Sequence, residues 1–140
     1  MRPTSPPAGS GRPDRGREFA VLAAIVLLGF VVRLAYVLTL EPRSLWFDGE
    51  RYSRLAAGLL EHGGYLTDQG RPTAYWPPGY PLFLAAVYRL FGVDIVAVRV
   101  AQCLLGAATI AVVHRIATKV LDRAGARLAA LATALYPLFI

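Results

Sequence analysis

The chain has 140 residues, of which 56% are hydrophobic, and a formal net charge of +6. Its mean hydropathy of +0.47 is high for a soluble domain and ordinary for a membrane protein. A single cysteine excludes an internal disulfide framework, and the two distant histidines exclude a His/Cys metal cluster. The positive charge fits cytoplasmic flanks beside anionic membrane lipids, and no basic patch with interleaved aromatics points to nucleic acid.

Residues 1–18 are rich in Pro, Gly, Ser and Arg, which predicts a disordered basic tail. The apolar run 19–40 that follows is broken only by Arg33. About 20 residues at a rise of ~1.5 Å cross the hydrocarbon core, so we predict a first transmembrane helix over 19–41. A signal peptide is the alternative, but the run is long for one and has no small-x-small cleavage site.

Arg33 allows two interpretations. It lies about 10 Å from the outer end of the predicted helix, so its guanidinium can reach the outer interface by snorkelling. Snorkelling is the interpretation that we favour at this point. The alternative directs Arg33 into a cavity that holds an anionic group.

Residues 42–94 form a predicted external loop with two surface helices, near 48–62 and 81–91. The first is amphipathic, contains an i,i+4 pair of Glu50 and Arg54, and is expected to lie with its apolar face on the membrane. The second spans roughly 16–18 Å, which is too short to cross a bilayer. The apolar face of the first helix consists of Tyr52, Leu55, Ala56, Leu59 and Leu60.

A second transmembrane helix is predicted over 95–118, followed by a basic cytoplasmic turn over 119–127. The start of a third transmembrane helix over 128–140 is expected to be truncated. Segments 1–18 and 115–127 each carry four basic residues, whereas 41–81 carries four Arg against five acids. The positive-inside rule therefore places the N-terminus in the cytoplasm and 42–94 outside, in a multi-pass protein.

The external loop combines carboxylates, arginines and aromatics. Asp48 follows a Trp-Phe pair, so partial desolvation would raise the pKa of its carboxyl and suit it to act as a general base. An N-cap role for Asp48 is the alternative, and spacing alone favours it. Glu50 would point about 200° away from Asp48 on a helix, so we do not expect the two acids to act as a pair.

Cationic and aromatic side chains complete the candidate site. Arg43, Arg51, Arg54 and Arg71 could bind a lipid headgroup or a leaving phosphate, although single exposed arginines are commonly solvated. Aromatics of the same loop could stack on a sugar, and an interfacial aromatic belt is the alternative. This aromatic group comprises Tyr65, Tyr75, Trp76 and Tyr80.

Several motifs occur in order: an Asp-x-x-x-Tyr helix from Asp48 to Tyr52, a Gly-Gly-Tyr ending, then Pro-Thr-Ala-x-x-Pro-Pro-Gly-Tyr-Pro over 72–81. In these motifs the chain, from residue 19 to 140, resembles the N-terminal part of the GT-C membrane glycosyltransferases of the family 39 type. These include the protein O-mannosyltransferases and the lipid A aminoarabinose transferase.

The resemblance implies an all-α integral membrane protein with an incomplete GT-C fold. It also implies transfer of a sugar from a polyprenyl-phosphate donor to an acceptor on the outer face of the plasma membrane. Asp48 matches the family's catalytic Asp, so the resemblance reverses the preference and favours a base over a cap. Many relatives have Asp-Glu where this chain has Asp48-Gly49-Glu50. No cofactor is certain, and a divalent cation is used by some relatives.

We predict that substrate binding involves residues of the external loop and the first span, namely Glu50, Arg51, Tyr52, Arg71, Tyr75, Tyr80 and Arg33. Because the family's enzymes have about a dozen spans, we expect residues 1–140 alone to be inactive. The competing hypothesis is a small non-enzymatic membrane subunit or scaffold that binds lipid headgroups or a partner through its external loop. A third and weaker hypothesis is a lipid transport component, since no predicted span contains the paired acids or the helix break expected of a coupling site.

Overall fold

The computed structural model describes residues 15–40, 47–66, 70–73 and 75–136. Within these residues the regular elements are five α-helices, with one isolated antiparallel bridge between Leu66 and Pro72. The predicted all-helical class is therefore confirmed for the described part of the chain. The helices are α1 (Arg15–Thr39), α2 (Phe47–His62), α3 (Gly79–Phe91), α4 (Ile95–Ala117) and α5 (Arg123–Leu135).

Two of these helices are long and apolar enough to cross a membrane. The 25 residues of α1 and the 23 residues of α4 give lengths of about 37 and 34 Å at a rise of ~1.5 Å. By the same measure α3, with 13 residues, extends about 20 Å and falls short of the ~30 Å hydrocarbon layer. The sequence prediction of two full-length apolar helices is confirmed.

Helix α1 begins earlier than the sequence predicted. It starts at Arg15 instead of residue 19, so residues 15–18 are helical and do not belong to a disordered tail. Within this first turn the Glu18 carboxylate accepts a hydrogen bond of 2.6 Å from Nη2 of Arg127 in α5. This partner lies 109 positions away in the sequence, so no local pattern could indicate it.

Helix α5 also begins earlier, at Arg123 instead of residue 128, because Asp122 is its N-cap. The Asp122 side chain accepts a hydrogen bond of 2.8 Å from the Gly125 amide, which satisfies one of the free N–H groups of the first turn. The basic turn between α4 and α5 is correspondingly shorter than the predicted 119–127.

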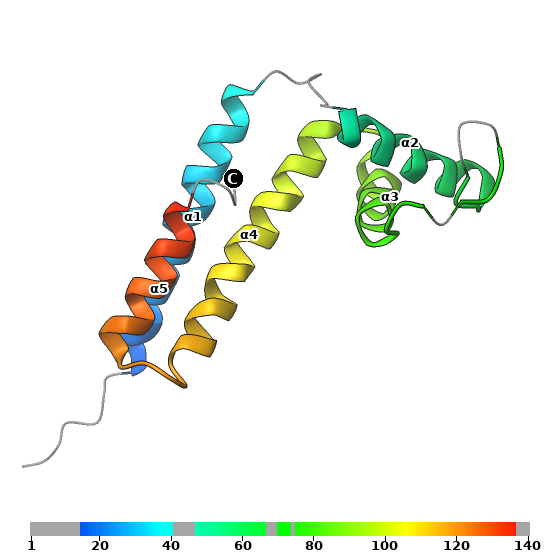
Figure 1. Ribbon diagram of the computed structural model, residues 1–140. Helices are drawn as coiled ribbons and strands as arrows, with labels where there is room; N and C mark the ends of the chain where they lie inside the picture. Colours follow the sequence, from blue (N-terminus) through cyan, green and yellow to red (C-terminus); the bar gives the residue numbers. More distant parts are fainter. Residues whose placement is uncertain (1–14, 41–46, 67–69, 74, 137–140) are drawn as a thin grey trace, which may run out of the picture.

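Helices α1, α4 and α5 lie alongside one another and share one apolar core (Figure 1). Ile110 of α4 is completely buried at its centre, between Ile25 of α1 and the alanines of α5. Every fourth residue of α5 is a fully buried alanine, which permits close approach of the helix backbones. These alanines are Ala126, Ala130 and Ala134.

Helices α2 and α3 gather at the N-terminal end of α4 (Figure 1). Ala56 of α2 packs against Leu84 and Tyr88 of α3, with Tyr52 and Leu59 at the margin of this second core. The apolar face of α2, expected to rest on the membrane, is therefore covered largely by α3. Only Leu60, at the edge of that face, is still 40% exposed.

Two hydrogen-bonded features hold this pair of helices in place. The hydroxyls of Ser53 and Tyr88 lie 2.8 Å apart, which links α2 to α3 within the core. Gly92 ends α3 with φ of 79°, a conformation that favours glycine, and its amide donates to the Tyr88 carbonyl. Two residues later Asp94 caps α4 by accepting from the Val96 amide at 2.7 Å.

Candidate functional site

Asp48 and Glu50 lie in the first turn of α2, where carboxylates interact favourably with the helix dipole. Because α2 already begins at Phe47, Asp48 occupies the first turn, which corrects the N-cap interpretation. Asp48 is exposed, and the side chains of the Trp-Phe pair that were expected to desolvate it lie outside the described residues, so its role as a base stays a prediction. Glu50 forms the expected pair with Arg54, at 3.5 Å. Trp46 lies outside the described residues.

Tyr52 places the Asp48 side of α2 against a cluster of aromatic rings. Residues four apart share a helix face, so Asp48 lies one turn before Tyr52 on the same side. The Tyr52 ring meets the Trp76 ring and the Tyr80 ring edge-on, each with centroids 5.3 Å apart. Edge-to-face pairs at this spacing add roughly 0.5–1.5 kcal/mol each beyond the area they bury.

Trp76 is the centre of this aromatic cluster, which we define as Tyr52, Tyr75, Trp76, Tyr80 and Phe83. The Tyr75 ring meets Trp76 edge-on at 5.5 Å, and Phe83 stacks on Tyr80 at 6.1 Å. The members come from α2, from the loop before α3 and from α3 itself. The sequence named most of these aromatics as a possible sugar platform, and the structure brings them together.

Cations lie at the edge of the aromatic cluster. The Arg51 guanidinium carbon is 5.8 Å from the centre of the Trp76 ring, within the range of a cation–π interaction. Arg51 and Arg71 are both exposed, and Tyr75 is 84% exposed. An anionic group near the cluster would therefore meet Arg51 and an open aromatic surface. Arg43 lies outside the described residues.

Two hydrogen bonds fix the phenols around the cluster. The Tyr65 hydroxyl donates to the Trp76 carbonyl at 3.0 Å, and Gln102 of α4 donates through Nε2 to the Tyr80 hydroxyl at 2.9 Å. Burial raises the pKa of Tyr80, the Gln102 hydrogen bond lowers it, and the nearby Tyr88 raises it again, with a net increase. Burial, followed by the proximity of Tyr52, also raises the pKa of Tyr65.

Arg33 lies inside the helix bundle, with 1% of its surface exposed, so the snorkelling interpretation is wrong. Its Nη1 donates to the Gly29 carbonyl at 2.9 Å and to the Ala134 carbonyl at 3.0 Å, and its Nη2 donates to the Thr133 carbonyl at 2.9 Å. Ala134 and Thr133 belong to the last turn of α5, whose carbonyls have no partner within the helix. Arg33 therefore caps the C-terminal end of α5, where a cation also complements the helix dipole.

Glycines make room for this buried side chain. A Cβ atom on Gly106 of α4 would lie 2.8 Å from Arg33 Nε, closer than real Cβ atoms approach. A Cβ on Gly29 would lie 3.0 Å from Arg33 Nη1 and would collide with Ile110. The Arg33 side chain thus points inward, its described partners are carbonyl oxygens, and an anionic group beside it stays a prediction.

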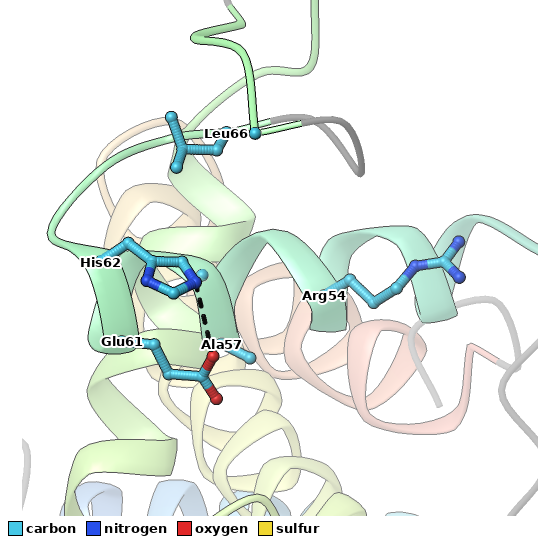
Figure 2. Close-up of a pocket in the computed structure, with 7 residues that line it drawn as sticks. Arg54, Ala57, Glu61, His62 and Leu66 are labelled. Atoms are coloured by element: carbon cyan, nitrogen blue, oxygen red, sulfur yellow. Dashed lines mark ion pairs between the residues drawn. The ribbon is translucent and has the colours of Figure 1, made fainter.

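A separate groove of about 410 Å³ lies at the opposite end of α2 from Asp48. Figure 2 shows the Glu61 carboxylate facing His62, with Leu66 above them and Arg54 further along the helix. The His62 Nε2 and Glu61 Oε2 atoms are 3.7 Å apart, and both side chains are largely exposed. Across the described residues, no group of three or more His, Cys, Asp or Glu side chains could hold a metal ion.

The match that bears on function begins at the centre of the aromatic cluster. Residues 76–140 match the family model described as dolichyl-phosphate-mannose-protein mannosyltransferase. The family resemblance predicted from the sequence is thereby confirmed over these residues. The matched range covers α3, α4 and α5, while Arg33 and Asp48 precede it. Searches of curated proteins and of solved structures gave no match.

Residues 76–140 are thus similar to a family of membrane glycosyltransferases, and α1 and α4 are long and apolar enough to cross a membrane. Sequence reasoning missed Gln102 and Phe83 as neighbours of the candidate site. A glutamine seven residues into an apolar span is the one signal that could have drawn attention to Gln102, because polar side chains in spans usually have a specific partner.

Proposed function

We propose that this chain serves a membrane glycosyltransferase that moves a sugar from a polyprenyl-phosphate donor to an acceptor on the outer face of the membrane. One observation carries the proposal: Trp76, the first residue of the family match, contacts Tyr52, which lies one helical turn from Asp48 on the same face. The aromatic cluster thus joins the matched region to the helix that bears the candidate base.

In this proposal Asp48 accepts the proton of the acceptor hydroxyl as that oxygen attacks the sugar. The lipid phosphate leaves from the opposite face of the sugar ring, which requires a base and a leaving group on different sides. Arg51 and Arg71 stabilise the departing phosphate, because guanidinium groups match phosphate oxygens in geometry and charge. The exposed rings of Tyr75 and Tyr80 stack on the sugar, and Glu50 and Tyr52 complete the binding surface.

The proposal includes a topology. Residues 1–18 and the turn before α5 lie in the cytoplasm, α1 and α4 span the plasma membrane, and α2 and α3 lie in the membrane plane on the outer side. This arrangement follows from the distribution of basic residues and from the shortness of α3. Labelling of cysteines introduced at Glu61 and Ala124 tests it, since only position 61 should react from outside intact cells.

Asp48→Asn in the natural gene product tests the catalytic assignment. The change preserves shape and removes the base, so transfer should fall by about 10²-fold or more with unchanged membrane levels. Glu61→Gln is the matched control, because Glu61 lies on α2 at the far end from Asp48 and should leave transfer unchanged. Normal transfer by Asp48→Asn would remove Asp48 from the mechanism and favour the scaffold hypothesis.

A further inference from the structure

A small cavity lies between α1, α4 and α5. Its volume is about 180 Å³, and it is lined by Arg33, Gln102, Leu105, Gly106, Thr109 and Thr133. At ~30 Å³ for each water molecule, this is room for about six waters, well below the ~300–1,000 Å³ of pockets for drug-sized ligands. The cavity therefore suits one small polar group and not a whole extended ligand.

The position of the cavity makes its polar lining costly. Gln102 and Thr109 lie about 10 and 21 Å along α4 from its start at Ile95, well inside the proposed span. Polar side chains inside membrane spans are rare and usually serve a function. Leu105 alone among the lining residues has an apolar side chain, and Gly106 contributes the space that a larger residue would fill.

The hydrogen bonds of the lining decide what chemistry fits. Thr109 Oγ1 donates to the Leu105 carbonyl at 2.9 Å, and Thr133 Oγ1 donates to the Ala129 carbonyl at 2.8 Å. A hydroxyl that donates its proton keeps its lone pairs as acceptors. Gln102 likewise donates through Nε2 to Tyr80, and its side-chain oxygen is an acceptor. These three side chains thus offer oxygen acceptors.

We propose that this cavity is a binding subsite for a neutral, hydroxyl-rich head group of a membrane-embedded ligand. Hydroxyl groups of the ligand donate to the acceptor oxygens of Thr109, Thr133 and Gln102, whereas a fully ionised phosphate has no proton to donate to them. Arg33 forms one wall, with its Nη atoms donating to backbone carbonyls. Gln102 connects the subsite to the aromatic cluster through Tyr80, so a bound head group lies next to the external loop.

Binding of small amphiphiles to the natural gene product in phosphatidylcholine nanodiscs tests the subsite without any transfer assay. The probes are hexyl mannoside, 1-O-hexyl glycerol, hexyl phosphate and hexanol, and the dissociation constants are measured by titration. We expect the mannoside or the glycerol ether to bind most tightly. Tighter binding of the mannoside identifies a sugar as the ligand, and tighter binding of the glycerol ether identifies a phospholipid glycerol; both outcomes support the subsite.

Substitutions in the cavity lining test whether the probes bind in this cavity. Thr109→Val and Thr133→Val keep the side-chain shape and should each weaken binding about three- to tenfold, the loss expected for one hydrogen bond. Thr118→Val makes the same change outside the cavity and should have no effect, because Thr118 is exposed at the end of α4, where its hydroxyl donates to the Arg115 carbonyl at 2.9 Å. Equal binding by all variants, tightest binding of hexyl phosphate, or hexanol binding as tightly as the mannoside would each overturn the proposal.

Discussion

Arg33 Nη1 donates a hydrogen bond of 3.0 Å to the carbonyl oxygen of Ala134, a residue 101 positions later in the chain. The bond joins the C-terminal half of α1 to the C-terminal end of α5. In a membrane such carbonyls have no water to bond, so a helix can end there only if the protein supplies donors. Arg33 supplies them from a side chain that is almost completely buried.

Replacing Arg33 should therefore destabilise the α1–α4–α5 bundle. Arg33→Leu leaves two α5 carbonyls without these donors, and we expect a loss of about 3 kcal/mol in the free energy of unfolding. Arg17→Leu is the control, since Arg17 is on the same helix and exposed. Thermal unfolding in detergent measures both, and equal melting temperatures for the two variants would contradict the capping role.

A larger residue at Gly29 should create a steric clash in the contact between Arg33 and α5. Gly29→Ala places a methyl group against Ile110, Arg33 and Ala134, and overpacking of this kind costs about 1–3 kcal/mol. Gly58→Ala should do the opposite, because no atom lies within 4 Å of its added Cβ and alanine favours a helix by about 1 kcal/mol. Thermal unfolding of the pair should shift in opposite directions, and a common shift would refute the close approach at Gly29.

The Glu18–Arg127 pair ties α1 to α5 at the proposed cytoplasmic end. Both side chains are partly exposed, so Glu18→Gln should cost about 1 kcal/mol at most. Glu50→Gln removes a longer and more exposed pair and should cost only about 0.3 kcal/mol. The double reversal of Glu18 to Arg and Arg127 to Glu should recover part of the loss, and an additive double variant would show that the two charges are not coupled.

The raised pKa of Tyr80 leads us to expect that the free energy of unfolding decreases at alkaline pH. Burial raises its pKa in the folded protein above the ordinary 10.0, so the folded state holds the phenol proton more tightly than the unfolded state. Its contribution is complete below pH 10 and declines as the pH rises through the folded-state pKa. Tyr80→Phe should flatten this decline in the free energy of unfolding, measured as a function of pH.

The hydrogen bond from Gln102 to Tyr80 can be tested through the titration of the Tyr80 phenol. Because that bond lowers the pKa of Tyr80, Gln102→Leu should move the phenolate titration of Tyr80 to higher pH. The difference in phenolate absorbance between Gln102→Leu and the Gln102→Leu/Tyr80→Phe double variant isolates this group. A titration at lower pH in Gln102→Leu would exclude the hydrogen bond.

The helices could be predicted from the sequence, because the features that form and end them lie close together in the chain. The apolar spacing in α2 and the glycine after α3 act within one or two turns, so the sequence contains the whole signal. The same spacing could not identify what covers the apolar face of α2. Tyr52 and Ala56 fit a membrane surface as well as they fit α3, and only the folded chain distinguishes the two.

Arg33 shows where sequence reasoning fails. A lone arginine near the end of an apolar run fits snorkelling, since the chain around it contains no sign of a partner. Its partners are backbone carbonyls of α5, which have no residue-specific signature, and the glycines that admit it lie on α1 and α4. The aromatic cluster was easier to anticipate, because its rings lie mainly in one short stretch around Trp76.

The buried alanines of α5 have a consequence for how this part of the protein can vary. With a buried methyl group at every fourth position, α5 contacts its neighbours along a narrow and closely packed stripe, whereas Leu128 and Leu135 are exposed. A saturation survey of α5 should therefore show intolerance with a period of four residues. At the exposed positions Leu128 and Leu135, other hydrophobic side chains should be accepted equally well.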